Sequence, residues 1–468
     1  MKNKLFILLC VWSYQCFSQI PIQEELTLST YLNIVKSYHP LVKQAQLKTT
    51  EGEAKILKAK GYFDPKLNLD KNIKHFKDKN YYNVFNTTLK IPTWYGIEVK
   101  AGYDKNSGVY LNPEDNVPST GLYAVGVSVP LLKGLLINER MANLKQAKLY
   151  FKQNTLKQQI LINDVLYEST VAYLHWVNTW YKTNIYTTYL DNANWKLENV
   201  RTKVRTGDSP AIDTTEAKIL VLNRSLELEK SKLELQKARL KLSNFLWASD
   251  LIPLELPEST IPDQDILNIS NTLKLNQAVL DSVNLDNHPK IKFINLAYKS
   301  LDFERKLHMN NLLPKVNVQY NMLSGSPEVA NSYHINSYKG GFQIEVPLFA
   351  RKARGNLKLT KTKLSHIELD LFNEKTILKN MFTNVYRTHK SYVTQFALAN
   401  QLTKNYSTLL KAEEQKFQAG ESSLFMINTR EKKLLQTQLK QVDLNTKLMK
   451  AYAKWFKVDI NMKSFSIN

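Results

Sequence analysis

Four short motifs occur twice in this chain of 468 residues, in the same order. Each copy begins with His-Pro, followed by a proline 25 residues later, a Val-Pro-Leu motif and a Gly-x-Ser motif. They lie at His39-Pro40, Pro65, 126–132 and 204–213 in the first copy, and at His288-Pro289, Pro314, 343–349 and 417–426 in the second. Chance rarely repeats four motifs in one order. We therefore predict duplicated halves, with a first repeat over 19–247, a linker over 248–274 and a second repeat over 275–468.

Long helices are the next feature that the sequence predicts. Residues 138–205 contain neither proline nor glycine. One helix over this stretch would be about 100 Å long, at about 1.5 Å per residue, whereas helices of globular proteins are far shorter. We predict long helices at about 138–205 and 351–418. Each is followed across a Gly-x-Ser turn by a second helix, at about 211–247 and 423–457.

Apolar residues recur every seven positions in two series within the predicted helix over 211–247. One series is Ile212, Ile219, Leu226, Leu233, Leu240 and Trp247, and the other is Val221, Leu228, Leu235 and Leu242. A two-stranded coiled coil has one such seam. Two seams about 200° apart around the helix predict a neighbour on each side, as in a wall of helices curved into a tube. The alternative is a helix buried within a bundle, although lysine and glutamate interrupt the apolar positions.

Apolar and polar residues alternate in four segments, which predicts β-strands at about 65–76, 121–130, 314–323 and 339–347. One face of each strand is apolar and the other is mostly polar. A soluble sandwich gives this pattern, and so does a membrane barrel with its apolar face outward. Two strands from each half cannot close a barrel, so closure would require several chains.

The first repeat also contains an insertion. The distance from Pro65 to Pro130 is 65 residues, whereas that from Pro314 to Pro347 is 33. Alternating residues at 97–103 predict a strand within the insertion. We expect an added hairpin outside the barrel. The alternative is that the insertion adds two strands to the barrel wall of each chain.

The amino-terminal segment predicts export. Lys2 and Lys4 precede an apolar stretch over 5–12, and small residues follow, so residues 1–18 read as a secretory signal peptide. Both cysteines, Cys10 and Cys16, lie inside it, which leaves none for disulfides or thiol chemistry in the mature chain. No later run of about eighteen apolar residues predicts a transmembrane helix.

The charge and the motifs of the chain reduce the number of functions that it is expected to have. The formal net charge is +22, but the lysines are scattered along helical segments, so we expect solvated faces, some contact with anionic lipid and no nucleic acid partner. The eight histidines form no close metal-binding pair, and no glycine-rich phosphate loop is present. We therefore expect no enzyme activity, no metal and no cofactor, and interpret His39 and His288 as helix-boundary residues.

Taken together, these features resemble the TolC-like outer-membrane efflux family. The resemblance covers nearly all of the mature chain. It is carried by LTLSTYLNIVKSYHP (26–40), SVPLLKG (128–134), NLKQAKLYF (143–151) and FQAGESSLFMINTREKKLLQTQL (417–439). The order of these segments is more specific than any one of them.

The resemblance implies an α+β membrane protein that forms a homotrimer. Four strands per chain would build a twelve-stranded β-barrel in the outer membrane, joined to a long α-helical coiled-coil tunnel in the periplasm. It implies a passive exit duct of a tripartite efflux or type I secretion system, for small molecules or polypeptides. The partners would be an inner-membrane pump, a periplasmic adaptor protein and outer-membrane lipid. The rival hypothesis is a soluble exported coiled-coil scaffold or adaptor, which accounts for the heptads and signal but not for the strands.

The resemblance also implies where the duct closes. The two Gly-x-Ser turns would shut the tunnel and contact the adaptor, through Gly207, Asp208, Ser209, Gly420, Glu421 and Ser422. Glycine suits the left-handed residue that ends a helix. We expect Asp208, Ser209 or Ser422 to cap the helix that follows.

Members of the family carry acidic residues six and nine positions after the second glycine, and a basic gate residue two positions after it. This chain has Met426, Thr429 and Ser422 there and so departs from the pattern. Asp213 and Glu216 have the equivalent spacing after the first glycine and share one helix face. The constriction candidates are thus Asp213, Glu216, Phe417, Met426 and Thr429. We expect a constriction that is less acidic and weakly sensitive to multivalent cations.

Overall fold

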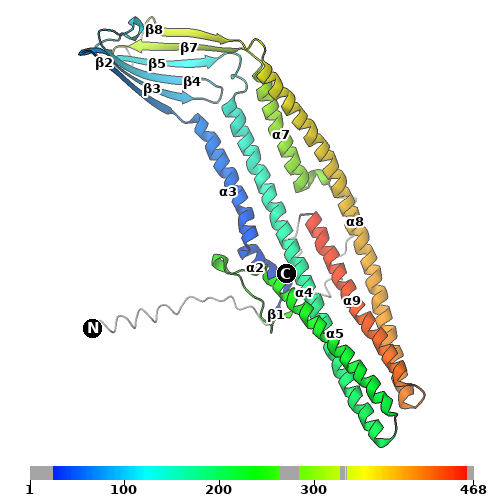
Figure 1. Cartoon of the computed structure of the whole chain (residues 1–468). Coiled ribbons are helices and arrows are strands. Elements are labelled where there is room, and N and C mark those ends of the chain that lie inside the picture. The colour runs from blue at the N-terminus through cyan, green and yellow to red at the C-terminus, as the bar shows by residue number, and fades with distance from the viewer. Residues whose placement is uncertain (1–24, 264–283, 327–332, 334, 461–468) are drawn as a thin grey trace, which may run out of the picture. The chain divides into compact units, whose positions relative to one another are not determined.

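A computed structural model describes residues 25–263, 284–326, 333 and 335–460 (Figure 1). The predicted signal peptide and residues 264–274 of the predicted linker lie outside the described residues. The chain divides into two compact units. The helical unit comprises Met1–Gln46, Gln159–His288 and Thr376–Asn468, and the sheet unit comprises Leu47–Gln158 and Pro289–Lys375. In the described part of the chain, no helix has the length and apolar character needed to cross a membrane.

The helices repeat in the same order in the two halves. The first half contains α3 (Pro40–Lys60), α4 (Glu139–Thr206) and α5 (Ala211–Ser243), and the second contains α7 (Pro289–Asn310), α8 (Arg351–Gln418) and α9 (Leu424–Val458). The longest helix of each half, α4 or α8, has 68 residues. Matching order and length confirm the prediction of duplicated halves. A short helix, α2 (Leu28–Tyr38), precedes α3, and β1 (Glu25–Leu26) and β6 (Ile261–Pro262) form a small parallel pair.

Each His-Pro pair starts a helix, as the sequence predicts. Pro40 is the first residue of α3, where a missing N–H costs nothing. His39 precedes it, and its ring Nδ1 accepts a hydrogen bond from the Leu41 amide at 3.2 Å. Burial lowers the pKa of the His39 imidazole, which keeps the ring neutral and able to accept. In the second copy α7 begins at Pro289, and His288 Nε2 donates to the Val458 carbonyl at 2.7 Å.

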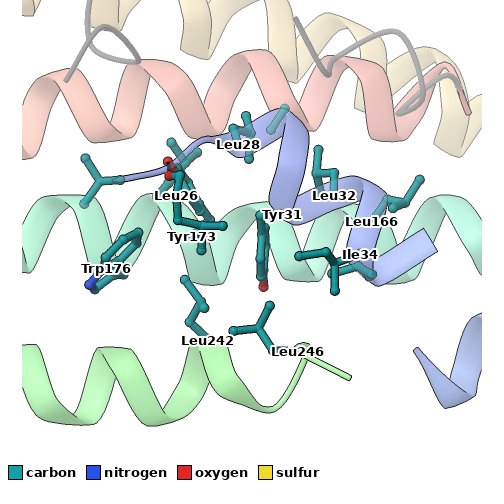
Figure 2. Packing of buried hydrophobic residues seen from close by; sticks show 14 of the residues in the cluster. Leu26, Leu28, Tyr31, Leu32, Ile34, Leu166, Tyr173, Trp176, Leu242 and Leu246 are labelled. Atoms are coloured by element: carbon teal, nitrogen blue, oxygen red, sulfur yellow. Dashed lines mark hydrogen bonds between the residues drawn. The ribbon is translucent and has the colours of Figure 1, made fainter. Parts of the chain in front are cut away.

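The core of the helical unit lies where α2 packs against α4, α5 and α9. Figure 2 shows Tyr31 of α2 among Tyr173, Trp176 and Leu242, side chains that are at most 1% exposed. The Tyr173 hydroxyl donates a hydrogen bond to the Leu26 carbonyl at 2.6 Å, so the polar end of this ring is satisfied. The amino-terminal segment is thereby fixed to the long helices.

The two heptad series of α5 have different surroundings within one chain. Leu228 and Leu242 of the second series are buried, and Val221 and Leu235 are half-buried. The first series is at least half exposed at five positions: Ile212, Ile219, Leu226, Leu233 and Leu240. One chain therefore covers one seam and leaves the other open.

In the described part of the chain, the sheet unit holds one antiparallel sheet of six strands in the order β2-β3-β4-β5-β7-β8. The strands are β2 (Lys66–Phe76), β3 (Lys79–Pro92), β4 (Glu98–Ser107), β5 (Leu122–Pro130), β7 (Lys315–Ser324) and β8 (Tyr338–Glu345). The insertion forms β3 and β4, between β2 and β5. The expected hairpin outside the sheet is therefore wrong, and the chain supplies six strands, not the four that the resemblance implies.

The reason is that β3 and β4 continue both faces of the sheet in register. One row of directly opposed residues reads Leu67, Leu89, Ala101, Val125, Met322 and Tyr338. The next row along every strand points to the other face and reads Lys66, Lys90, Lys100, Gly126, Asn321 and Lys339. A hairpin outside the sheet would have no cause to match this apolar and polar alternation. The apolar face is open: Leu67, Leu69, Phe342 and Ile344 are more than half exposed.

Candidate functional site: the helical turns and the cleft beside them

The turn from α4 to α5 is a Schellman motif. Gly207 has φ +84°, and its N–H donates to the Val204 carbonyl at 3.2 Å. The Asp208 N–H donates to the Lys203 carbonyl at 2.8 Å, so two free carbonyls at the end of α4 are satisfied. A Cβ at Gly207 would meet no described atom within 4 Å. Glycine is therefore needed here for its backbone conformation and not for space.

The turn from α8 to α9 repeats this backbone. Gly420 has φ +78°, its N–H donates to the Phe417 carbonyl at 3.1 Å, and the Glu421 N–H donates to the Lys416 carbonyl at 2.9 Å. A Cβ at Gly420 would likewise meet no described atom within 4 Å. The repeated Gly-x-Ser motif thus encodes one turn geometry twice.

The expected capping residues are wrong. Ser423 is the N-cap of α9, and its Oγ accepts from the Met426 amide at 3.4 Å. At the start of α5 the N-cap is Pro210, whose side chain cannot accept a hydrogen bond. Asp208 instead accepts from the Thr206 hydroxyl at 2.6 Å. The Schellman turn uses the glycine and the residue after it, so each new helix begins too late for the expected side chains to cap it.

A cleft of about 870 Å³ lies beside the two turns, among the ends of α4, α5, α8 and α9. The predicted site residues that line it are Ser209, Asp213, Glu216, Phe417 and Ser422. Met426 and Thr429 belong to α9 but are not among its lining residues. The cleft also takes in Trp195, Lys196, Lys203 and Phe425, which the sequence did not indicate.

Ser422 fastens the second turn to its own helices. Its hydroxyl donates to Glu413 Oε1 of α8 at 2.6 Å. Arg430 of α9 lies 3.5 Å from the other carboxylate oxygen of Glu413. The hydrogen bond from Ser422, helped by the Arg430 charge, lowers the pKa of the Glu413 carboxyl. This polar cluster holds α8, the turn and α9 together.

Two contacts join the helices of different repeats across the cleft. Glu216 Oε1 of α5 accepts from Asn428 Nδ2 of α9 at 3.2 Å. Lys203 Nζ of α4 lies 4.8 Å from the centre of the Phe417 ring of α8, a cation–π distance. Two of the predicted constriction residues, Glu216 and Phe417, are thus engaged in bridging contacts within the chain.

A largely buried ion pair begins at the cleft-lining residue Lys196 and has no signal in the sequence. Lys196 Nζ of α4 is 2.5 Å from Glu431 Oε2 of α9, and their side chains are only 15% and 4% exposed. The two residues are 235 positions apart, and each sits among ordinary helical lysines and glutamates. Three-dimensional packing alone brings them together.

The described residues contain no group of three or more His, Cys, Asp or Glu side chains suited to a metal ion. The contacts at the cleft are a hydrogen bond, an ion pair and a cation–π contact. These contacts hold the helix ends in one arrangement.

Solved structures share this fold. The CmeC outer membrane channel of Campylobacter jejuni is 12% identical, with 93% of this chain and 85% of that chain covered and a TM-score of 0.64. The outer membrane protein VceC of Vibrio cholerae is 12% identical, with 93% and 96% covered and a TM-score of 0.63. The open state of the MtrE outer membrane channel of Neisseria gonorrhoeae is 13% identical, with 92% and 88% covered and a TM-score of 0.62. No protein-family model and no curated protein sequence matches the chain.

Similarity over more than nine-tenths of the chain defines the class. The chain has the fold of the TolC-like outer-membrane channels, with long paired helices joined to antiparallel strands. The family resemblance read from the sequence is confirmed at the level of fold.

Proposed function

We propose that this protein is the outer-membrane exit duct of a tripartite efflux or type I secretion system. It would carry small molecules or polypeptides passively across the outer membrane. The observation that carries the proposal is the fold, which is shared over more than nine-tenths of the chain with CmeC and MtrE, both outer membrane channels. The exposed apolar face of the sheet supports contact with lipid, because such a face is costly in water.

The sheet edges support a ring of several copies. In the described part of the chain, β2 and β8 each have a strand on one side only. Because six strands alternate in direction, β2 and β8 run in opposite directions. The β8 strand of one copy can therefore pair antiparallel with β2 of the next, which removes both edges. In a homotrimer, six strands from each copy make an eighteen-stranded barrel, wider than the twelve strands first expected.

The open heptad seam of α5 supports the same assembly. A row of leucine and isoleucine at least half exposed along one helix requires a partner. Helices of a neighbouring copy would cover it and complete a coiled-coil tunnel. The turns at Gly207, Asp208 and Ser209, and at Gly420, Glu421 and Ser422, would then meet a periplasmic adaptor that links the duct to an inner-membrane pump.

Single-channel recording tests the proposal. The protein, purified from membranes in detergent, should insert into a planar lipid bilayer and give discrete, long-lived conductance steps. The rival, a soluble exported scaffold, predicts a protein that washes off membranes and gives no steps. An integral protein that gives no steps should begin to conduct when the cross-cleft contacts are removed by Glu216→Ala and Phe417→Ala. If this variant also gives no conductance steps, the proposal of an exit duct is contradicted.

A further inference from the structure

Four of six positions in one row of the sheet are lysine. The register pairs Lys66 of β2 with Lys90 of β3, and Lys90 with Lys100 of β4. The row continues through Gly126 and Asn321 to Lys339 of β8. Directly opposed residues point to the same face, so these four amines lie on the polar face. We call Lys66, Lys90, Lys100 and Lys339 the lysine row.

This arrangement carries a cost in stability. Like charges directly opposite each other on neighbouring strands are destabilising, and β2, β3 and β4 place three lysines side by side. Among the described residues, no carboxylate lies within 4 Å of any of the four amines, so no ion pair offsets the repulsion. If stability were the only requirement, an acidic residue in this row would stabilise the sheet.

The neighbouring rows do not neutralise the lysine row. On one side the opposed residues are Asn68, Thr88, Gly102, Ala124 and Leu323, none of which is acidic. On the other side they are Pro92, Glu98, Ser128, Gln319 and Gly341. The single carboxylate there, Glu98, already forms an ion pair with Arg140. Two carboxylates, Asp70 of β2 and Asp104 of β4, lie two rows further along the polar face, and of these Asp104 feels the Lys339 charge.

We propose that the lysine row lines the lumen and makes the duct selective for anions. The inference rests on the proposed function, in which the polar face points inward and three copies close the barrel. Four lysines from each copy would then form a belt of twelve positive charges that runs obliquely around the wall of the pore, because barrel strands are tilted. Charge of one sign in a water-filled passage with low-dielectric walls concentrates counter-ions. The cargo class it favours is small molecules or polypeptides that carry carboxylate, phosphate or sulfate groups.

Two lysines of the row, Lys90 and Lys100, belong to the inserted strands. The insertion therefore adds half of the positive charge of the belt as well as adding strands. Lys90 and Lys100 are half-buried, whereas Lys66 and Lys339 are exposed on the edge strands. In a closed ring Lys66 and Lys339 of neighbouring copies would lie on adjacent strands and join the belt.

The test is the reversal potential of open channels in a KCl gradient. The wild type should prefer chloride over potassium. The dilute chamber holds about 0.1 M salt, so that a charge acts over about 10 Å. Under this condition the double variant Lys90→Gln and Lys100→Gln should lower the preference for chloride about threefold or more. Inorganic triphosphate on the barrel side should block the wild type more strongly than this variant.

A matched control removes two charges from the opposite face of the sheet, one of them on β4 as in the test variant. Lys71 of β2 and Lys105 of β4 both oppose Phe85 of β3 and therefore lie on the apolar face. The variant Lys71→Gln and Lys105→Gln should leave the reversal potential and the triphosphate block unchanged.

The outcomes separate the two proposals. Absence of channels, even when Glu216→Ala and Phe417→Ala are added to remove the cross-cleft contacts, contradicts the exit duct itself. Channels whose chloride preference is the same in the wild type and in the Lys90/Lys100 variant contradict the lysine belt alone. A shift of equal size in the control variant also contradicts it, because the effect would then come from total charge and not from the polar face.

Discussion

The two helix-to-helix turns share one backbone and differ in how side chains hold them. Both are Schellman motifs with a glycine in the left-handed region. The second turn is fastened by Ser422 to Glu413, and by the Ser423 cap to α9. The first turn has a contact within itself, from Thr206 to Asp208, and a proline where a cap would be. The two copies share the backbone geometry of the turn, but their side-chain contacts differ. The first turn has fewer such contacts, so it is the looser of the two.

Looseness of one turn suits the proposed docking of an adaptor. A segment that opens locally at low cost can rearrange without unfolding the helices behind it. The helices that bear the two turns are nonetheless joined by Lys196 and Glu431, which connect α4 to α9. Four predictions test which contacts each turn depends on.

The largest effect is expected from the shared ion pair. Glu431→Ala leaves the Lys196 charge in a largely buried site, which should lower the free energy of local opening by roughly 3 kcal/mol. Hydrogen exchange of backbone amides at 203–210 and 416–423 measures it, and both turns should exchange faster. Adding Lys196→Met should recover most of the loss. The exposed pair Lys232–Glu229 is the control, since Glu229→Ala should cost under about 1 kcal/mol. Faster exchange in one turn alone would show that the pair does not join them.

The second-largest effect is expected from replacing the glycine of each turn, and the loss of stability should be equal in the two turns. Gly207→Ala and Gly420→Ala each place a Cβ on a left-handed residue, at a cost of roughly 1 kcal/mol. Because neither Cβ meets a described atom within 4 Å, backbone strain is the whole effect. Hydrogen exchange of the same amides measures it. A cost more than about twofold greater at one turn would contradict the shared geometry.

Much of the fold could be predicted from the sequence because its signals are long and periodic. The helix α4 follows from a stretch at 138–205 without proline or glycine, and α8 occupies the matching place in the second copy of the repeated motifs. The His-Pro pairs and glycines mark helix ends by local chemistry. Register between strands has no such local signal, and the pairing of β3 with both β2 and β4 became visible only in the sheet. That is why the insertion was misplaced and the lysine row was missed.

The site was predictable at its turns and not across its cleft. Gly207 and Gly420 could be read from sequence, because a positive φ requires a particular residue type. The contacts of Glu216 with Asn428, and of Lys196 with Glu431, depend on how helices more than 200 residues apart pack. No rule based on the spacing of residues in the sequence predicts contacts between residues so far apart. The adaptor and gate roles of the turn residues stay predictions until a partner is tested.

A smaller effect is expected from replacing the N-cap residue of the helix that follows each turn, and it should differ between the two turns. Ser423→Ala removes the hydrogen bond to the Met426 amide and should lower the stability of the start of α9 by about 1 kcal/mol. Pro210→Ala removes no capping bond, so the start of α5 should change by less than about half that amount. Amide exchange at 424–427 and 211–214 gives the two values. An equal loss at both would mean that the second turn is not more tightly held than the first.

The smallest effect should appear as a pH dependence of the second turn. The pKa of Glu413 is lowered in the folded chain, so its ionised form stabilises the fold. That contribution is fully present above the unfolded value of about 4.3 and is lost as pH falls through the lowered folded value. The mature chain is expected to lack cysteine, so Glu421→Cys and Asp208→Cys accept a fluorophore at one turn each. Anisotropy of the label at the second turn should fall at acidic pH, and Glu413→Gln should abolish this change. A label at the first turn that responds equally, or a response that survives Glu413→Gln, would show that the carboxylate is not what fastens the second turn.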